Sequence, residues 1–301
     1  MSFNEGARLD TSQVTGGGGS RGGLAIGGGI GGLVIVLIGA FLGVDLTSLG
    51  GTSSPFDTSQ VQTAGDESTT TFDQCQTGAD ANRDTTCRII GTVNSVQAYW
   101  TEALPADVSR QYRAAKTVIY QGSTQSPCGT ASNQTGPFYC PGDERIYIDA
   151  SFFDELESTY GADGGALAQE YVVAHEYGHH VENILGYLAK GQDGKRGPQS
   201  GGVRIELMAD CMAGVWANHA STTEDADGNT LLKPLTDADI DSALSAASAV
   251  GDDHIQEKLG GGNVNQDTWT HGSSESRQKW FLNGYEAGNV NACDTFSTND
   301  L

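Results

Sequence analysis

The sequence predicts an α+β fold that is mainly helical and contains a small sheet. Two long segments, residues 165–188 and 203–220, carry apolar residues at helical spacing. Runs of β-branched and aromatic residues are few and short, and the clearest are 116–120 and 145–150. Because helical segments outnumber strands, we expect helices packed against a small sheet in one domain.

The remaining helices are expected from their periodicity and their end signals. The first should end just before Pro105, since proline disfavours a helical conformation in the residue that precedes it. Ser151 and Thr236 are suitable N-caps, and Gly161 is a suitable C-terminal stop. Residues 194–202, rich in glycine, should form a loop between the two long helices. The four further helices are expected at residues 89–104, 151–161, 236–250 and 273–288.

The chain divides by composition into five parts. Residues 1–23 are polar and glycine-rich, which is typical of a flexible tail. Residues 24–44 are uncharged and, at about 1.5 Å per residue, long enough to cross the roughly 30 Å hydrocarbon layer of a membrane as one helix. Residues 45–74 are rich in Ser, Thr and Gly and predict a disordered tether. The folded domain is expected at 75–296, with a short tail at 297–301.

Charges beside the apolar run predict its orientation. Arg8 and Arg21 precede it and Asp45 follows, which favours a cytoplasmic N-terminus and an extracytoplasmic domain in the cell membrane. A cleaved signal peptide is the alternative, but the run is long for one and no clear cleavage site follows. The expected protein is therefore single-pass and anchored.

The overall charge limits the partners. The 16 Lys and Arg against 38 Asp and Glu give a net charge of −22, which argues against a nucleic-acid partner. The six Cys form no CxxC pair, so an even number of dispersed cysteines predicts disulfides and an oxidising compartment.

The segment His175-Glu176-Tyr177-Gly178-His179 has the H-E-x-x-H spacing of zinc hydrolases. On a helix the two histidines lie about 40° apart, so both imidazoles reach one ion, and Glu176 stands beside them. His180 points about 100° away from His179 and is expected to be structural. The pattern predicts one Zn²⁺ ion held by His175 and His179, with Glu176 as general base.

The second long helix offers the ligand that this pair lacks. Glu206 and Asp210 share one face of an otherwise apolar helix, which is costly unless something positive lies opposite. We expect Glu206 to be the third zinc ligand and Asp210 to accept the far N–H of His175. The alternative is an ion pair with Arg204 or another cation.

A late segment, Thr-His-Gly-Ser-Ser-Glu-Ser-Arg, supplies two further candidates. His271 should lie in a loop before the last helix, where it could donate to the oxyanion of a tetrahedral intermediate, although a capping or surface histidine is the alternative. Arg277 could serve the same oxyanion or be structural. His219 and His254 are expected at the surface, and DADGN at 225–229 is expected to be a plain turn.

These motifs together resemble the bacterial putative neutral zinc metallopeptidase family. The resemblance is carried by AHEYGHHVENILG, VRIELMADCMAGVW and THGSSESR, with GPFYCP at 136–141, GDD at 251–253 and GVDL at 43–46, and it covers most of residues 20–296. It implies a membrane-anchored, zincin-like metalloprotease domain of the gluzincin kind. It also implies zinc ligands at His175, His179 and Glu206, a base at Glu176 and a supporting acid at Asp210.

The resemblance also suggests where a substrate binds. In zincins an edge strand above the active-site helix pairs with an extended peptide. The expected strand consists of Arg145, Ile146, Tyr147, Ile148 and Asp149. Proximity and position along the chain suggest the disulfides Cys75–Cys87, Cys128–Cys140 and Cys211–Cys293, although six cysteines allow 15 pairings.

The function expected from these residues is zinc-dependent hydrolysis of peptide bonds. Glu176 would take a proton from the zinc-activated water and pass it to the leaving amine, with His271 helping at the oxyanion. A non-catalytic, membrane-tethered scaffold with a structural zinc is the alternative, and the intact Glu176 speaks against it. An amidase acting on cell-wall material is a third possibility that the residues leave open.

Overall fold

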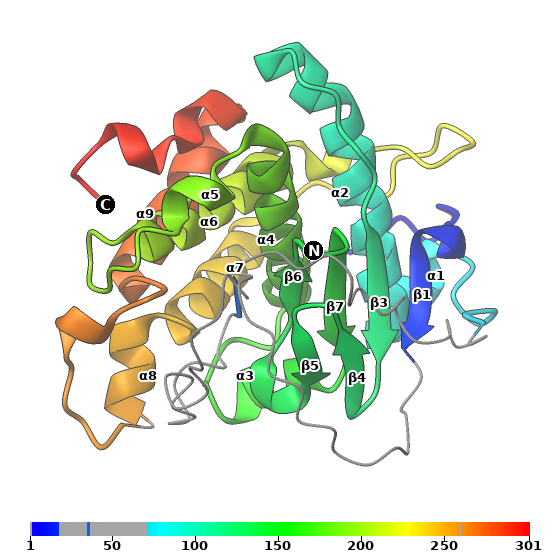
Figure 1. Cartoon of the computed structure of the whole chain (residues 1–301). Helices are drawn as coiled ribbons and strands as arrows, with labels where there is room; N and C mark the ends of the chain where they lie inside the picture. Colours follow the sequence, from blue (N-terminus) through cyan, green and yellow to red (C-terminus); the bar gives the residue numbers. More distant parts are fainter. Residues whose placement is uncertain (1, 18–34, 37–70, 259) are drawn as a thin grey trace, which may run out of the picture.

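The computed structural model describes residues 2–17, 35–36, 71–258 and 260–301, and within them it confirms a mixed α+β fold (Figure 1). The helices are α1 (Gly78–Ala81), α2 (Thr85–Val108), α3 (Phe152–Ser158), α4 (Ala166–Leu185), α5 (Leu188–Gly191), α6 (Gly201–His219), α7 (Asp237–Ala249), α8 (Asp252–Lys258) and α9 (Ser274–Ala287). The strands are β1 (Val14–Gly17), β2 (Ile35–Val36), β3 (Lys116–Tyr120), β4 (Ser123–Ser126), β5 (Gly129–Ser132), β6 (Phe138–Cys140) and β7 (Arg145–Asp149).

The predicted helices occur close to their expected positions. The largest difference is at α2, which begins after the N-cap Asp84 and continues through Pro105 to Val108. Thr236 caps α7 by accepting the N–H of Asp239, as its sequence position predicts. The short helices α1, α5 and α8 were not predicted, because such short segments carry little periodicity.

The main sheet has the strand order β1-β3-β7-β6-β2. Strands β1, β3 and β7 run parallel, whereas β6 runs antiparallel to β7 and carries β2 on its outer side. The prediction that residues 145–149 form an edge strand is therefore wrong, because β7 pairs with β3 on one side and with β6 on the other.

Helices α4 and α6 form the centre of the helical side and pack tightly against each other. A Cβ atom at Gly178 on α4 would lie 2.9 Å from the Cα atom of Ala209 on α6, so only glycine permits this approach. The contact brings the two helix backbones close enough for a side chain of α6 to reach the histidines of α4. Helix α9 packs along the other side of α6 (Figure 1).

Three disulfides stabilise the domain, and they confirm the suggested pairing. They join Cys75 to Cys87, Cys128 to Cys140 and Cys211 to Cys293. The last one fixes the C-terminal segment to α6, the helix that carries Glu206. Residues 297–301 are also held to the domain, because Arg204 donates to the carbonyl of Thr298 and Lys279 pairs with Asp300, so the predicted tail is wrong.

The largest correction concerns the N-terminus. Residues 2–17, which we call the N-terminal strap, pack on the domain and are not a flexible tail. Phe3 is fully buried, and β1 pairs with β3 at the end of the sheet opposite β6 (Figure 1). In the described part of the chain, no helix is both long and apolar enough to span a membrane. Apart from residues 35–36, the predicted anchor at 24–44 lies outside the described residues, as does the tether up to residue 70.

Candidate metal centre

Three side chains from α4 and α6 meet at one point in the interior. His175 Nε2 lies 3.3 Å from one carboxylate oxygen of Glu206, and His179 Nε2 lies 3.7 Å from the other. Ligand atoms about 2.0–2.1 Å from a tetrahedral zinc are about 3.3–3.4 Å apart, so these spacings suit one ion. Both Nε2 atoms and Glu206 Oε2 are buried without a hydrogen-bond partner in the described structure. An ion bound between them would satisfy all three.

The other ring nitrogen of each histidine is already engaged. His175 Nδ1 lies 2.8 Å from Asp210 Oδ1, and His179 Nδ1 lies 2.8 Å from Glu182 Oε2. Because an acidic side chain occupies Nδ1 of each ring, Nε2 is left as the metal-binding atom. The role of Asp210 agrees with the sequence prediction. Glu182 was missed, although its place three residues after His179 on the same helix was a usable signal.

The charge balance at the three ligands also suits a cation. Although burial raises the pKa of Glu206, His175 and His179 hold it at about 2, so the carboxylate is ionised. Burial lowers the pKa of His179 to about 3, which keeps that ring neutral. Burial also lowers the pKa of His175, but Asp210 outweighs it and raises the pKa to about 9. A metal would therefore displace a proton from His175 on binding.

Arg277 lies behind His175 and pairs with Asp210. Its Nε atom donates to one carboxylate oxygen at 2.8 Å and its Nη2 atom donates to the other at 2.9 Å. Both residues are fully buried, so this bidentate pair fixes the acid that orients His175. Arg277 is thus a structural cation in this arrangement. The alternative partner Arg204 instead donates to the main-chain carbonyls of Thr295 and Thr298.

Glu176 lies beside the ligands on α4 and is suited to act as a base. It is fully buried, and both of its carboxylate oxygens lack a hydrogen-bond partner in the described structure. Burial raises the pKa of Glu176 to about 8, against an opposing effect from His175. A carboxyl group with this pKa can exchange a proton near neutral pH. Strand β6 lies beside this helix, because His180 and Asn183 of α4 hydrogen-bond with the hydroxyl of Tyr139.

His271 is held by an acid that the sequence argument had not assigned to it. Asp252 Oδ2 accepts the main-chain N–H groups of Thr270, His271 and Gly272 at 2.8, 2.7 and 2.9 Å. Its other oxygen lies 3.3 Å from His271 Nδ1. Burial lowers the pKa of His271, but Asp252 and Glu206 outweigh it and raise the pKa to about 9. His271 is therefore a cation near the ligands at neutral pH, and Asp252, the first acid of the GDD motif, positions it.

The other histidines have structural partners. His180 contacts the Tyr139 hydroxyl through Nδ1 and donates through Nε2 to the carbonyl of Arg113, which fits the structural role expected for it. His219 and His254 each contact a main-chain carbonyl, of Gly288 and of Tyr160. Both side chains are partly buried, whereas the sequence predicted them at the surface.

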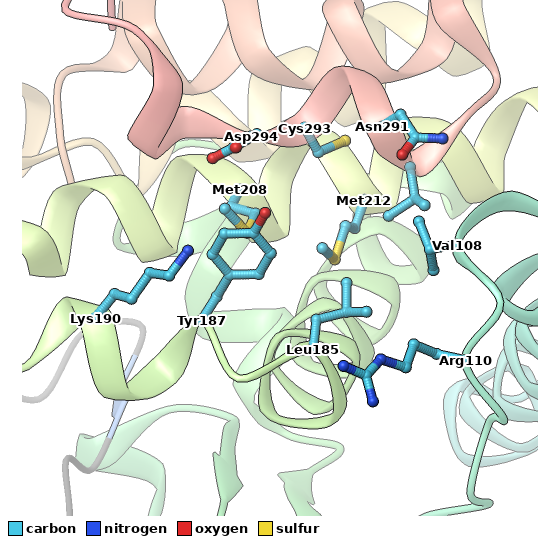
Figure 2. A pocket seen from close by; sticks show the side chains of 11 residues that line it. Val108, Arg110, Leu185, Tyr187, Lys190, Met208, Met212, Asn291, Cys293 and Asp294 are labelled. Carbon is cyan, nitrogen blue, oxygen red and sulfur yellow. The ribbon is translucent and has the colours of Figure 1, made fainter.

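A separate cavity of about 330 Å³ lies on another face of α6 (Figure 2). Met208 and Met212 of α6 contribute to its wall, and Arg110 and Lys190 bring positive charge to it. Glu206 and Asp210 project from α6 toward α4 and α9, so this cavity contains none of the metal-centre residues.

The fold and this centre define a class: an α+β protein with a two-histidine, one-glutamate zinc-type site. The chain belongs to the putative neutral zinc metallopeptidase family, whose sequence model matches residues 4–296. It is 52% identical over 229 residues to the uncharacterized protein Rv2575 of Mycobacterium tuberculosis, covering 76% of each chain. It is 36% identical over 269 residues to the uncharacterized protein YpfJ of Escherichia coli K12, covering 88% of this chain and 85% of YpfJ. No solved structure matches significantly.

Proposed function

We propose that this protein is a zinc-dependent endopeptidase of the gluzincin kind. The observation that carries the proposal is the meeting of His175 Nε2, His179 Nε2 and the Glu206 carboxylate, which are buried and mutually spaced as ligands of one ion. Glu176 beside them is a base that a purely structural metal site does not need. The family to which the chain belongs is described as a zinc metallopeptidase family, which supports the proposal.

His175, His179 and Glu206 would hold the zinc, which when bound supplies Lewis acidity toward water and the substrate carbonyl. Glu176 accepts the proton of the attacking water and delivers it to the leaving amine. Its pKa of about 8 suits both transfers near neutral pH. The cationic ring of His271, positioned by Asp252, stabilises the negative charge that develops on the carbonyl oxygen.

The substrate strand in this proposal is β6. It lies between β7 and the two-residue strand β2, and α4, which carries Glu176, lies beside it through hydrogen bonds of His180 and Asn183 with the Tyr139 hydroxyl. An extended peptide pairing with β6 would therefore run alongside the helix that carries the base. In the structure, Ile35 and Val36 hold this edge opposite Tyr139 and Phe138, so a substrate would take their place.

We further propose that the domain works in an oxidising, extracytoplasmic compartment. Three disulfides use all six cysteines, which supports such a location. Attachment to the cell membrane through residues 24–44 stays a prediction from the sequence.

The test is a Glu176→Gln protein assayed on unfolded protein and on a peptide library, with zinc content measured in parallel. Loss of the base should lower kcat by about 10²–10⁴-fold and leave the zinc content unchanged, because the three ligands are intact. Glu170→Gln, which changes another buried acid of α4 outside the centre, is the matched control and should keep its activity.

The same assay separates the alternatives. Cleavage by Glu176→Gln at the wild-type rate would contradict the mechanism. Wild-type protein that binds zinc and cleaves nothing would instead favour a scaffold. Release of muropeptides without cleavage of peptide libraries would favour an amidase.

A further inference from the structure

The N-terminal strap is anchored by a buried aromatic ring. Phe3 is fully buried and packs against α2, where a Cβ atom at Gly91 would come within 2.5 Å of the Phe3 ring. Gly91 therefore forms a notch that the ring fills. The side-chain amide of Asn82 closes over it, accepting the N–H of Phe3 at 2.8 Å and donating to its carbonyl at 3.0 Å. Such a reciprocal pair recognises the main chain of the strap as well as its side chain.

The next residue joins the strap to a different part of the domain. The main-chain N–H of Asn4 donates to the carbonyl of Leu231 at 2.9 Å. Its side-chain amide donates to the carbonyl and hydroxyl oxygens of Thr230, both at 2.8 Å. The strap thus bridges Gly91 on α2 and Thr230 in the loop before α7, which are 139 residues apart in the sequence.

The DADGN turn supplies the charged part of this docking surface. Asp225 accepts the main-chain N–H of Arg8 at 2.7 Å, and Asp227 accepts from its guanidinium at 2.9 Å. Asp225 also accepts the N–H groups of Asp227 and Asn229, which fixes the turn. The turn therefore binds a strap residue, a role that its sequence did not reveal.

The end of the strap completes the sheet. Asn94 on α2 accepts the N–H of Asp10 at 2.8 Å and donates to its carbonyl at 3.0 Å, repeating the arrangement at Asn82. Beyond it, the four residues of β1 pair in parallel with β3, from Val14 opposite Thr117 to Gly17 opposite Tyr120. The strap thereby covers a sheet edge that would otherwise expose unpaired main-chain groups.

We propose that residues 2–17 are a docking strap for the chain's own metal-centre domain, so that both lie on the same side of the membrane. The predicted anchor at 24–44 falls between the strap and the domain in the sequence. One crossing at that point would leave the strap and its docking surface on opposite faces, where none of these contacts can form. The flanking charges predicted a cytoplasmic N-terminus. In this proposal the N-terminus instead lies on the same side of the membrane as the metal centre. This inference does not depend on peptidase activity.

Disulfide trapping in the full-length protein tests the docking. Thr15 and Val118 are register partners on β1 and β3. Neighbouring strands lie about 4.8 Å apart, which suits the roughly 4.4–6.8 Å Cα separation of a disulfide. All six native cysteines are paired, so no native thiol competes. Under mild oxidation, Thr15→Cys with Val118→Cys should form an intramolecular bond, and proteolysis between residues 18 and 70 should then leave the strap attached until reduction.

The outcomes of trapping are distinct. Ser12→Cys with Val118→Cys is the matched control and should not cross-link, because Ser12 precedes the strand and is exposed. Covalent dimers in place of the intramolecular bond would show that a second copy supplies the strap, which overturns docking in the same chain. Absence of any cross-link in folded protein would overturn the docking itself.

Labelling in intact cells tests the same-side arrangement. Single variants Ser12→Cys in the strap and Val264→Cys in the domain each place a thiol at an exposed position. A membrane-impermeant maleimide should label both to the same extent in intact cells and again after lysis. Labelling of Val264→Cys in intact cells, with Ser12→Cys protected until lysis, would overturn the proposal.

Discussion

The metal centre and the N-terminal strap both pack against the helices of the domain, but different interactions dominate in the two regions. The centre depends on charged side chains of α4, α6 and α9, such as the Asp210–Arg277 pair. The strap depends on an apolar ring, Phe3, and on main-chain hydrogen bonds to two asparagines. We therefore expect changes at the centre to affect metal binding and chemistry, and changes at the strap to affect stability alone.

Asp210→Asn should have the largest effect, because it changes both properties. It leaves the buried guanidinium of Arg277 without its charge partner, which should cost about 3–5 kcal/mol in the free energy of unfolding. It also removes the group that orients His175, which should weaken zinc binding about 10–100-fold. Chemical denaturation and competition with a chelator measure the two effects. Asp241→Asn, at an exposed acid on α7, is the control and should change neither property. Wild-type zinc affinity in Asp210→Asn would contradict the expectation that changes at the centre affect metal binding.

Phe3→Ala tests the strap side of the comparison. Removing a fully buried ring should lower the free energy of unfolding by about 3–5 kcal/mol. The zinc content and the kcat per folded molecule should stay unchanged, since the ring contacts none of the metal-centre residues named above. Denaturant titration and activity below the melting temperature measure this, with Val264→Ala, which is 41% exposed, as control. A fall in kcat of the folded Phe3→Ala enzyme would show that the strap also affects the chemistry of the metal centre.

Glu170→Gln sharpens the comparison through pH. Burial raises the pKa of Glu170 to about 7 from an ordinary 4.5, and neither of its oxygens has a hydrogen-bond partner among the described residues. The raised pKa means that protonated Glu170 favours the folded state. This contribution to the free energy of unfolding is fully present below the pKa of the unfolded state and is lost as pH rises through the pKa of the folded state. By pH 8 the penalty should reach about 3 kcal/mol. In melting curves, the stability of Glu170→Gln relative to wild type should increase between about pH 4.5 and 7. A stability difference that is constant with pH would contradict this prediction.

Asp252→Asn should have the smallest effect, and on chemistry alone. The carboxylate of Asp252 raises the pKa of His271 to about 9, so its loss should lower that pKa and move the alkaline limit of activity to lower pH. With the ring less firmly positioned, kcat at neutral pH should fall about 10-fold, less than the 10²–10³-fold cost of removing an oxyanion donor outright. A pH–rate profile measures both. An unmoved alkaline limit would show that Asp252 is only structural.

Much of the candidate site could be predicted from the sequence because helix geometry is local. The spacing of His175 and His179 fixes both rings on one side of α4, and the spacing of Glu206 and Asp210 does the same on α6. The positions of the long helices followed from the same periodicity. The partners of His179 and His271 were within reach too, since Glu182 is three residues away on the same helix and Asp252 belongs to the GDD motif.

Sheet order could not be predicted, because strand pairing joins segments that are distant in sequence. Residues 145–149 have the composition of any short strand, and composition does not distinguish an interior strand from an edge strand. Only the pairing of β7 with both β3 and β6 shifts the proposed substrate edge to β6.

The sequence by itself determined the long helices, the zinc-type ligand pattern and the disulfide pairing suggested by position. The tertiary structure decided where the N-terminus lies. A glycine-rich, polar segment looks like a tail when it is considered alone, because its few apolar residues have no periodicity. Phe3 packs against Gly91, and Arg8 binds the DADGN turn, only after α2 and the loop before α7 have come together. These contacts join residues more than 80 positions apart, and local sequence carries no record of them.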